Sequence, residues 1–169
     1  MTTTTTIPNA YALKVAATHA WKNDTKPALN GVRVEYDGET LTIAATDSYR
    51  LFMHEARTGK AGDAVAVTIP LSALKAMRVV KTSGAGTLTI DGGRGSLRVG
   101  GTEYGFDVVG ASFPDYRPLF PAVLCDGYTS RLNPAYVADA SKAVAIAAAP
   151  EAPRYADTPV PAEKSSPHM

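Results

Sequence analysis

The sequence has 169 residues, enough for one complete domain and part of a second, since domains usually hold about 100 to 200 residues. Hydrophobic residues make up 45% and charged residues 20%, which is typical of a chain with a packed core and excludes a wholly disordered protein. Seventeen basic residues against 16 acidic ones give a net charge of +1, so affinity for nucleic acid must come from the arrangement of charge and not from its total.

The two ends of the sequence differ in composition from its middle. Met1 and the five threonines that follow predict either a flexible N-terminus over residues 1–6 or the opening of an edge strand. Five prolines in residues 150–169 predict a disordered tail. Cys125 is the single cysteine and excludes an intrachain disulfide, and with no signal-like or membrane-spanning stretch a cytoplasmic location is expected.

A short motif occurs twice, 62 residues apart, and divides the foldable middle of the chain. Thr-Ile-Pro stands at 6–8 and again at 68–70, each time where a strand-like stretch gives way to a helical one. The first helix is expected over about 8–22. Alternation over 32–36 and 41–45, joined by Asp37-Gly38, predicts a hairpin with one buried face.

The second unit repeats this order. Alternation predicts a strand over 65–69, and Leu74, Met77 and Val80 form the apolar side of a helix over 70–81. Strands are then expected around 88–90, 97–99 and 104–108. A third unit begins with a helix that is capped by Asn133, has Pro134 at its first position and continues through an Ala-rich stretch to about 148. Each complete unit reads β-α-β-β-β, which predicts an α+β fold with two helices packed on antiparallel sheets.

Positive charge is concentrated on the two predicted helices. No acidic residue lies between positions 8 and 23 or between 64 and 90. Lys14 and Lys22 share one stripe of the first helix, and Lys75, Arg78 and Lys81 fall within about 120° on an ideal wheel of the second. Such faces suit sequence-independent contact with phosphates, although solvated helix faces that carry ordinary lysines have the same pattern.

Residues for catalysis or metal binding are not gathered in any known pattern. His19, His54 and His168 are far apart, and Cys125 has no neighbouring Cys or His, so no metal site or cofactor is expected. Ser72, Ser83 and Ser112 lie outside a Gly-x-Ser-x-Gly elbow, and the glycine clusters read as hairpin turns. The chain is therefore not expected to be an enzyme.

Three segments carry a family resemblance: Lys26-Pro-Ala-Leu-Asn-Gly-Val, Ala45-Thr-Asp-Ser-Tyr-Arg-Leu51 and Phe113-Pro-Asp-Tyr-Arg-Pro-Leu-Phe-Pro121. With the strand-to-helix start at Ile69-Pro70, they resemble the middle domain of the bacterial DNA polymerase III beta sliding clamp. The resemblance implies a complete clamp domain over 7–121 and part of the next over 122–149. It also implies a ring of six such domains, with the helices lining a central hole and the sheets outside.

The resemblance implies a processivity factor that tethers replication proteins to duplex DNA. Residues expected to contact DNA without reading its sequence are Lys14, Lys22, Lys26, Lys75, Arg78 and Lys81. In this family the replicative polymerase and the clamp loader dock short peptides, with a glutamine and two hydrophobic anchors, into a cleft between the middle and last domains. The matching positions are Leu29, Thr46, Ser48, Tyr49, Arg50, Leu51 and Pro121.

This sequence departs from the family pattern in two ways. Ser48-Tyr49 stands where the family usually has Gly-His, so the rim of the peptide cleft is expected to be bulkier. The family's first domain and most of its last domain have no counterpart here, which fits a fragment, a truncated reading frame or a reduced, phage-type clamp. The main expectation is a sliding clamp or a clamp-derived subunit, which encircles DNA only if the chain is competent to assemble into a ring. The alternative is a monomeric interaction module that binds clamp-binding peptides without encircling DNA.

Overall fold

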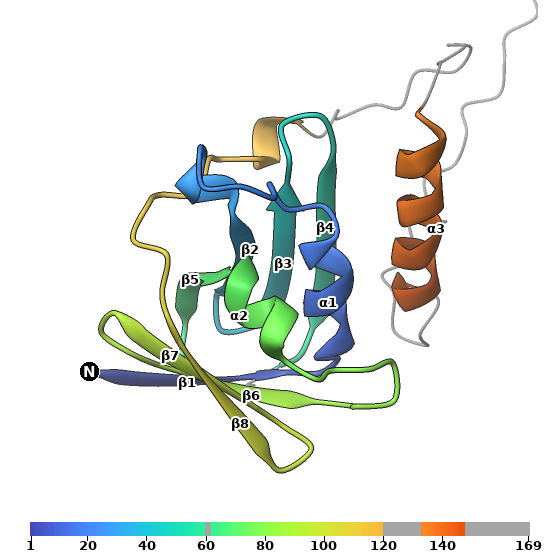
Figure 1. Ribbon diagram of the computed structural model, residues 1–169. Helices are drawn as coiled ribbons and strands as arrows, with labels where there is room; N and C mark the ends of the chain where they lie inside the picture. Colours follow the sequence, from blue (N-terminus) through green and yellow to red (C-terminus); the bar gives the residue numbers. More distant parts are fainter. Residues whose placement is uncertain (60–61, 120–132, 148–169) are drawn as a thin grey trace, which may run out of the picture.

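A computed structural model describes residues 1–59, 62–119 and 133–147 (Figure 1). Its regular elements, in chain order, are β1 (Thr2–Ile7), α1 (Tyr11–Ala17), a 3-10 turn (Pro27–Leu29), β2 (Gly31–Tyr36), β3 (Thr40–Thr46), β4 (Leu51–Arg57), β5 (Val65–Pro70), α2 (Leu71–Ala76), β6 (Gly86–Asp91), β7 (Arg94–Val99), β8 (Thr102–Asp107), a second 3-10 turn (Arg117–Leu119) and α3 (Pro134–Ala147). The duplicated β-α-β-β-β order is confirmed. Part of the predicted division into domains, including the tail at 150–169, lies outside the described residues.

The eight strands form two antiparallel sheets, and the two repeats exchange their first strands. The sheets have the orders β1-β6-β7-β8 and β4-β3-β2-β5. Strand β1 of the first unit therefore pairs with β6 of the second, while β5 of the second pairs with β2 of the first. This exchange joins the two units into one domain, with the predicted α+β architecture.

The threonine-rich start is a paired strand, so the prediction of a flexible segment over 1–6 is wrong. Thr2 to Ile7 pair with Asp91 to Gly86 along the whole length of β6. The side chain of Thr5 is buried and donates a hydrogen bond of 2.5 Å to the carbonyl of Asp63. The β-branched side chains suit this edge position, which was the other possibility that the sequence left open.

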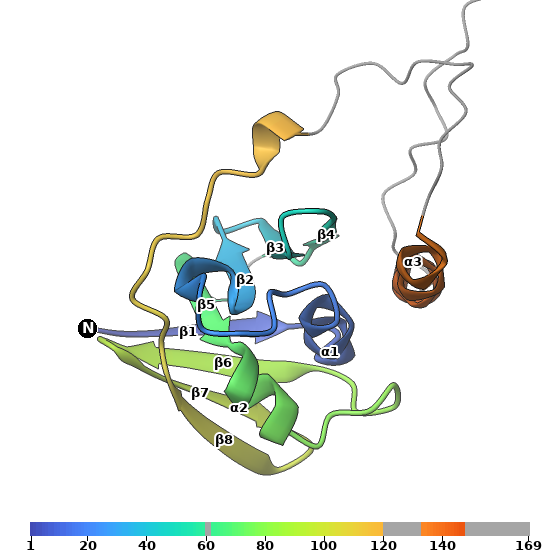
Figure 2. The same ribbon diagram turned by 45° about the horizontal axis from the view of Figure 1, so that its top comes forward.

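One hydrophobic core lies between the sheets and the helices (Figures 1 and 2). Ile7 and Ile69, the equivalent residues of the two repeats, are both 0% exposed. Leu13 of α1 and Leu74 of α2 are each 1% exposed and belong to the same cluster. The apolar residues whose spacing predicted the strands and helices are thus the ones that pack the two units together.

Both helices of the domain are shorter than predicted. Helix α1 ends at Ala17 and not near 22, and the Thr18 hydroxyl donates a hydrogen bond of 2.7 Å to the carbonyl of Val15. Helix α2 ends at Ala76 because Met77 is extended, with φ −70° and ψ 132°. Val79 is therefore buried and Val80 is 58% exposed, which corrects the expected apolar side of a helix over 70–81.

Helix α3 lies beside α1, on the side away from α2 (Figures 1 and 2). It begins as predicted, with Pro134 in the first turn and the Asn133 side chain accepting a hydrogen bond of 3.0 Å from the Ala135 amide. Ile146 is 5% exposed and belongs to the core cluster. In the described parts of the chain, no helix is long and apolar enough to cross a membrane.

Candidate functional site

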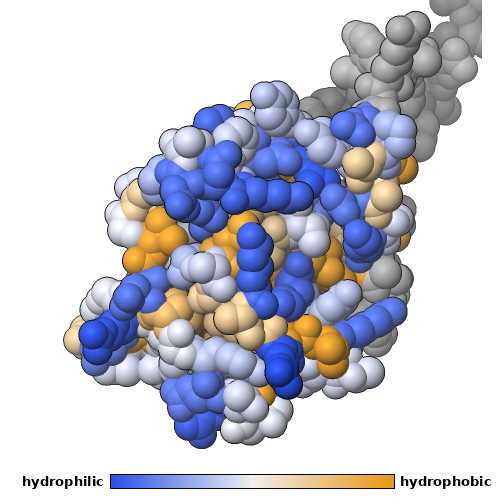
Figure 3. All heavy atoms as spheres, viewed as in Figure 1, coloured by the Kyte–Doolittle hydropathy of each residue, from blue (hydrophilic) through white to orange (hydrophobic). Residues whose placement is uncertain are grey.

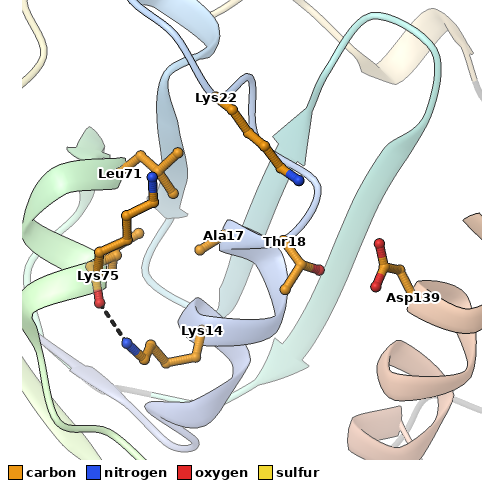
Figure 4. Close-up of a pocket in the computed structure, with 8 residues that line it drawn as sticks. Lys14, Ala17, Thr18, Lys22, Leu71, Lys75 and Asp139 are labelled. Carbon is orange, nitrogen blue, oxygen red and sulfur yellow. Dashed lines mark hydrogen bonds between the residues drawn. The ribbon is translucent and has the colours of Figure 1, made fainter. Parts of the chain in front are cut away.

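A basic groove lies between α1 and α2. Its cavity of about 350 Å³ has an apolar floor that includes Ala17 and Leu71, and Lys14, Lys22 and Lys75 project around it (Figure 4). A second cavity, of about 370 Å³, shares Lys22, Leu71 and Lys75 with the first. On this face hydrophilic side chains surround a less polar centre (Figure 3). The two cavities form what is called the lysine groove below.

Lys14 joins the two helices that form the groove. The residue is half-buried, and its ammonium donates a hydrogen bond of 2.7 Å to the carbonyl of Leu74, in the last turn of α2 (Figure 4). A cation at this end of a helix satisfies a carbonyl that has no partner within the helix and complements the helix dipole. Lys14 thus both braces the groove and contributes positive charge to it.

Lys22 and Lys75 are exposed and directed to solvent at the groove. Within the described parts of the chain, neither ammonium has a hydrogen bond or a salt bridge. Lys75 lies on α2, whereas Lys22 follows the end of α1. The prediction that Lys14 and Lys22 lie on one helix is therefore wrong. Lys22 nevertheless lines the same groove as Lys14 and Lys75.

The other predicted cations lie outside the lysine groove. Arg78 and Lys81 follow the end of α2, so their predicted arc with Lys75 on one helix is wrong. The Lys26 ammonium lies 4.3 Å from the ring centroid of Trp21 and 3.0 Å from the Ser48 hydroxyl oxygen. Lys26 therefore connects the loop before β2 to the turn between β3 and β4, where the expected peptide-binding residues lie.

The expected peptide-binding residues gather around that β3–β4 turn. Thr46 stabilises it, since its hydroxyl donates to the Arg50 carbonyl at 2.7 Å and accepts from the Ser48 amide at 3.1 Å. Ser48 has a left-handed φ of 75°, and Tyr49 is 78% exposed. Leu51 is half-buried at the start of β4, and Leu29 is buried at the end of the first 3-10 turn. Pro121 lies outside the described residues.

Arg50 is the most connected of these side chains. Its guanidinium donates hydrogen bonds to Asp47 at 3.0 Å, to the Thr18 carbonyl at 2.8 Å and to Asp139 of α3 at 2.7 Å. It also lies 4.5 Å from the ring centroid of Tyr136. The Arg50 hydrogen bond, followed by that of Lys142, lowers the pKa of Asp139 to about 2. The sequence missed Tyr136 and Asp139 because their helical spacing does not reveal which surface α3 contacts.

Two of the three histidines, His19 and His54, lie within the described residues, and burial affects both. The His19 ring is buried against Phe52, with centroids 5.3 Å apart, and burial is the main cause that lowers its pKa. Burial likewise lowers the pKa of His54 on β4. His168 and Cys125 lie outside the described residues. Across the described ranges, no cluster of three or more His, Cys, Asp or Glu residues is placed to hold a metal ion.

Hydrogen bonds to Glu35 of β2 hold the segment that follows β8. Tyr116 is 2% exposed and donates a hydrogen bond of 3.2 Å to the Glu35 carboxylate, to which the Arg117 guanidinium also donates. Arg33 donates to the other carboxylate oxygen at 3.0 Å. Burial alone raises the pKa of Glu35, but the hydrogen bonds from Arg33 and Arg117 outweigh it and lower the pKa overall. This contact accounts structurally for part of the Phe-Pro-Asp-Tyr-Arg motif.

The substitution Glu35→Gln is expected to lower the free energy of unfolding by about 1–3 kcal/mol, because three donors lose a charged acceptor and Tyr116 stays buried. Urea denaturation measures the change. Glu103→Gln is the control, since its pair with Arg98 is exposed to solvent and is expected to contribute little to stability. Equal effects of the two substitutions would contradict a special role for Glu35.

The comparisons with known proteins agree with this geometry. Residues 10–115 match the family model described as DNA polymerase III beta subunit, central domain. The chain belongs to the DNA polymerase III beta subunit family. Beta sliding clamps of Micrococcus luteus and Streptomyces coelicolor are 33% and 30% identical to it over 82% and 70% of this chain.

A solved structure of the beta subunit of DNA polymerase III from Thermotoga maritima is also similar, with a TM-score of 0.61 at 26% identity over 71% of this chain. The two curated relatives are covered over 46% and 34% of their own lengths, and the Thermotoga maritima chain over 34%. The sequence thus spans half or less of the beta subunits that it resembles. Residues 10–115 contain every regular element from α1 to β8 and all residues that line the lysine groove except Asp139, whereas β1 precedes them.

Proposed function

We propose that this chain is a DNA polymerase processivity clamp, or a clamp-derived subunit, that contacts duplex DNA through the lysine groove. The observation that carries the proposal is that Lys22 and Lys75 line the same groove, unpaired within the described residues, on the helical face of a beta-subunit domain. Flexible ammonium groups around an apolar floor suit phosphates of any sequence, because they neutralise charge without reading base edges. The chain retains DNA without catalysing a reaction, and acts in the cytoplasm.

The proposal includes two kinds of protein partner. The β3–β4 turn, with Leu29, Thr46 and Leu51, receives short peptides of the replicative polymerase and the clamp loader. Edge strands β4 and β8 present backbone groups that further domains can pair with, and this supports self-association into a ring. A six-domain ring requires several copies of this domain or further domains of a longer chain.

Two measurements on the purified chain test the proposal. Fluorescence anisotropy with duplexes of unrelated sequence is expected to give equal affinities. With about three phosphate contacts, log K is expected to fall with log salt at a slope of about −3. Light scattering over a concentration range is expected to give defined multimers. Salt-independent or sequence-specific binding would contradict the DNA part of the proposal, and a monomer at every concentration would contradict autonomous encirclement.

A further inference from the structure

Helix α3 contacts the domain through one face. Tyr136, Asp139, Ala143 and Ile146 follow helical spacing, and each is at least partly shielded from solvent. Ile146 reaches the core cluster and Ala143 packs against it. Val137 and Val144, on another face, are 50% and 65% exposed. The contact is thus specific to one side of the helix and has an apolar end and a polar end.

The polar end of this contact is centred on Arg50. The guanidinium reaches Asp139 at 2.7 Å and lies over Tyr136, while its other nitrogens hold Asp47 and the Thr18 carbonyl. The Arg50 side chain is only 13% exposed and that of Asp139 is 21% exposed. Charge-assisted hydrogen bonds in such a shielded place are stronger than exposed ion pairs. Docked α3 therefore covers the guanidinium that an incoming ligand would use.

This surface belongs to the same turn as the expected peptide site. Arg50 closes the β3–β4 turn, between Thr46 and Leu51, and its side chain is turned toward α3. We propose that α3 occupies this surface in cis as a competing ligand, presenting Tyr136 and Asp139 to Arg50, so that a partner peptide must displace α3 to bind. This inference rests on the proposed peptide-binding function of the turn.

The competition has a measurable size. If only a fraction of the molecules has Arg50 free of α3, the apparent dissociation constant of the peptide equals the intrinsic constant divided by that fraction. If α3 leaves Arg50 in about one molecule in ten, release of the helix tightens peptide binding by about tenfold. The double substitution Tyr136→Ala with Asp139→Ala removes both contacts with Arg50 and leaves the β3–β4 turn unchanged. Val137→Ala with Val144→Ala is the matched control, because it alters the exposed side of the same helix.

The test uses the full chain and a fluorescein-labelled peptide with one glutamine and two large hydrophobic side chains. Hydrogen exchange of the α3 amides reports whether the helix is released, and circular dichroism reports that the domain remains folded. Release in the double variant, with binding about tenfold tighter than in the wild type and the control, is the expected result. Equal binding by all three chains would overturn the competition and leave the peptide site intact. If no chain binds the peptide although α3 is released, both the competition and the peptide site are wrong.

Discussion

Replacing Lys22 and Lys75 together with glutamate is expected to weaken binding to duplex DNA by about 10- to 100-fold at low salt. Both ammonium groups lie at the lysine groove, exposed and without a protein partner in the described residues. Each lost phosphate contact is expected to reduce the slope of log K against log salt by about 1, so the slope falls by about 2. Fluorescence anisotropy with one duplex over a range of salt concentrations measures both quantities.

The control for this variant changes the net charge by the same amount elsewhere. Arg94→Glu with Arg98→Glu replaces two cations on β7, where each arginine pairs with an exposed acidic residue. If the lysine groove binds DNA, this control retains most of the affinity and nearly the whole salt slope. Equal losses in the two variants would show that overall charge attracts the DNA and that the groove has no particular part in it.

Replacing Ile69 with alanine is expected to lower the free energy of unfolding by about 2–5 kcal/mol. Ile69 is 0% exposed and lies opposite Val32, where β5 of the second unit pairs with β2 of the first. The smaller side chain leaves a cavity where the two repeats meet. Urea denaturation measures the effect, with Ile69→Val expected to cost about 0.5–1.5 kcal/mol.

Ala66 provides a control on the same strand, because it is exposed and Ala66→Ser is expected to change stability by at most about 0.5 kcal/mol. A cost below about 1 kcal/mol for Ile69→Ala would contradict the interpretation that β5 anchors the second unit in the core of the first.

Local patterns in the sequence predicted which segments form strands and where the units repeat. Period-two alternation located β2, β3 and β5 to β8, and Asp37-Gly38 predicted their first hairpin turn, in which Asp37 accepts hydrogen bonds from the amides of Glu39 and Thr40. Strand β4 was not located, because only Phe52 of its seven residues is buried and the segment shows no clean alternation.

Pairing between distant strands could not be predicted in this way. The threonine-rich start and the alternation over 65–69 indicate that both segments can form strands, but neither pattern says which sheet each strand joins. The end of α2 was also hidden, since Met77 to Val80 are residues that a helix tolerates and the extended conformation of Met77 depends on burying Val79. Tertiary packing decided both outcomes.

The candidate site was predicted in part. Concentration of lysines on two segments free of acidic residues predicted a basic face, and the family resemblance added the residues of the β3–β4 turn. Neither indicated that Lys14 would hold the last turn of α2 or that Arg50 would hold Asp139, because both are contacts between residues at least 60 positions apart. The roles of these residues toward DNA and peptides stay predictions.

Backbone amide chemical shifts, recorded while duplex DNA is added to the isotope-labelled chain, test the central claim most directly. The account predicts that the largest changes fall at residues 14–22 and 71–75, which border the lysine groove, and that they diminish as salt is added. The strands β7 and β8 are expected to change little. Changes centred on those strands, or no changes at a DNA concentration that saturates anisotropy, would contradict the assignment of the lysine groove as the DNA-binding face.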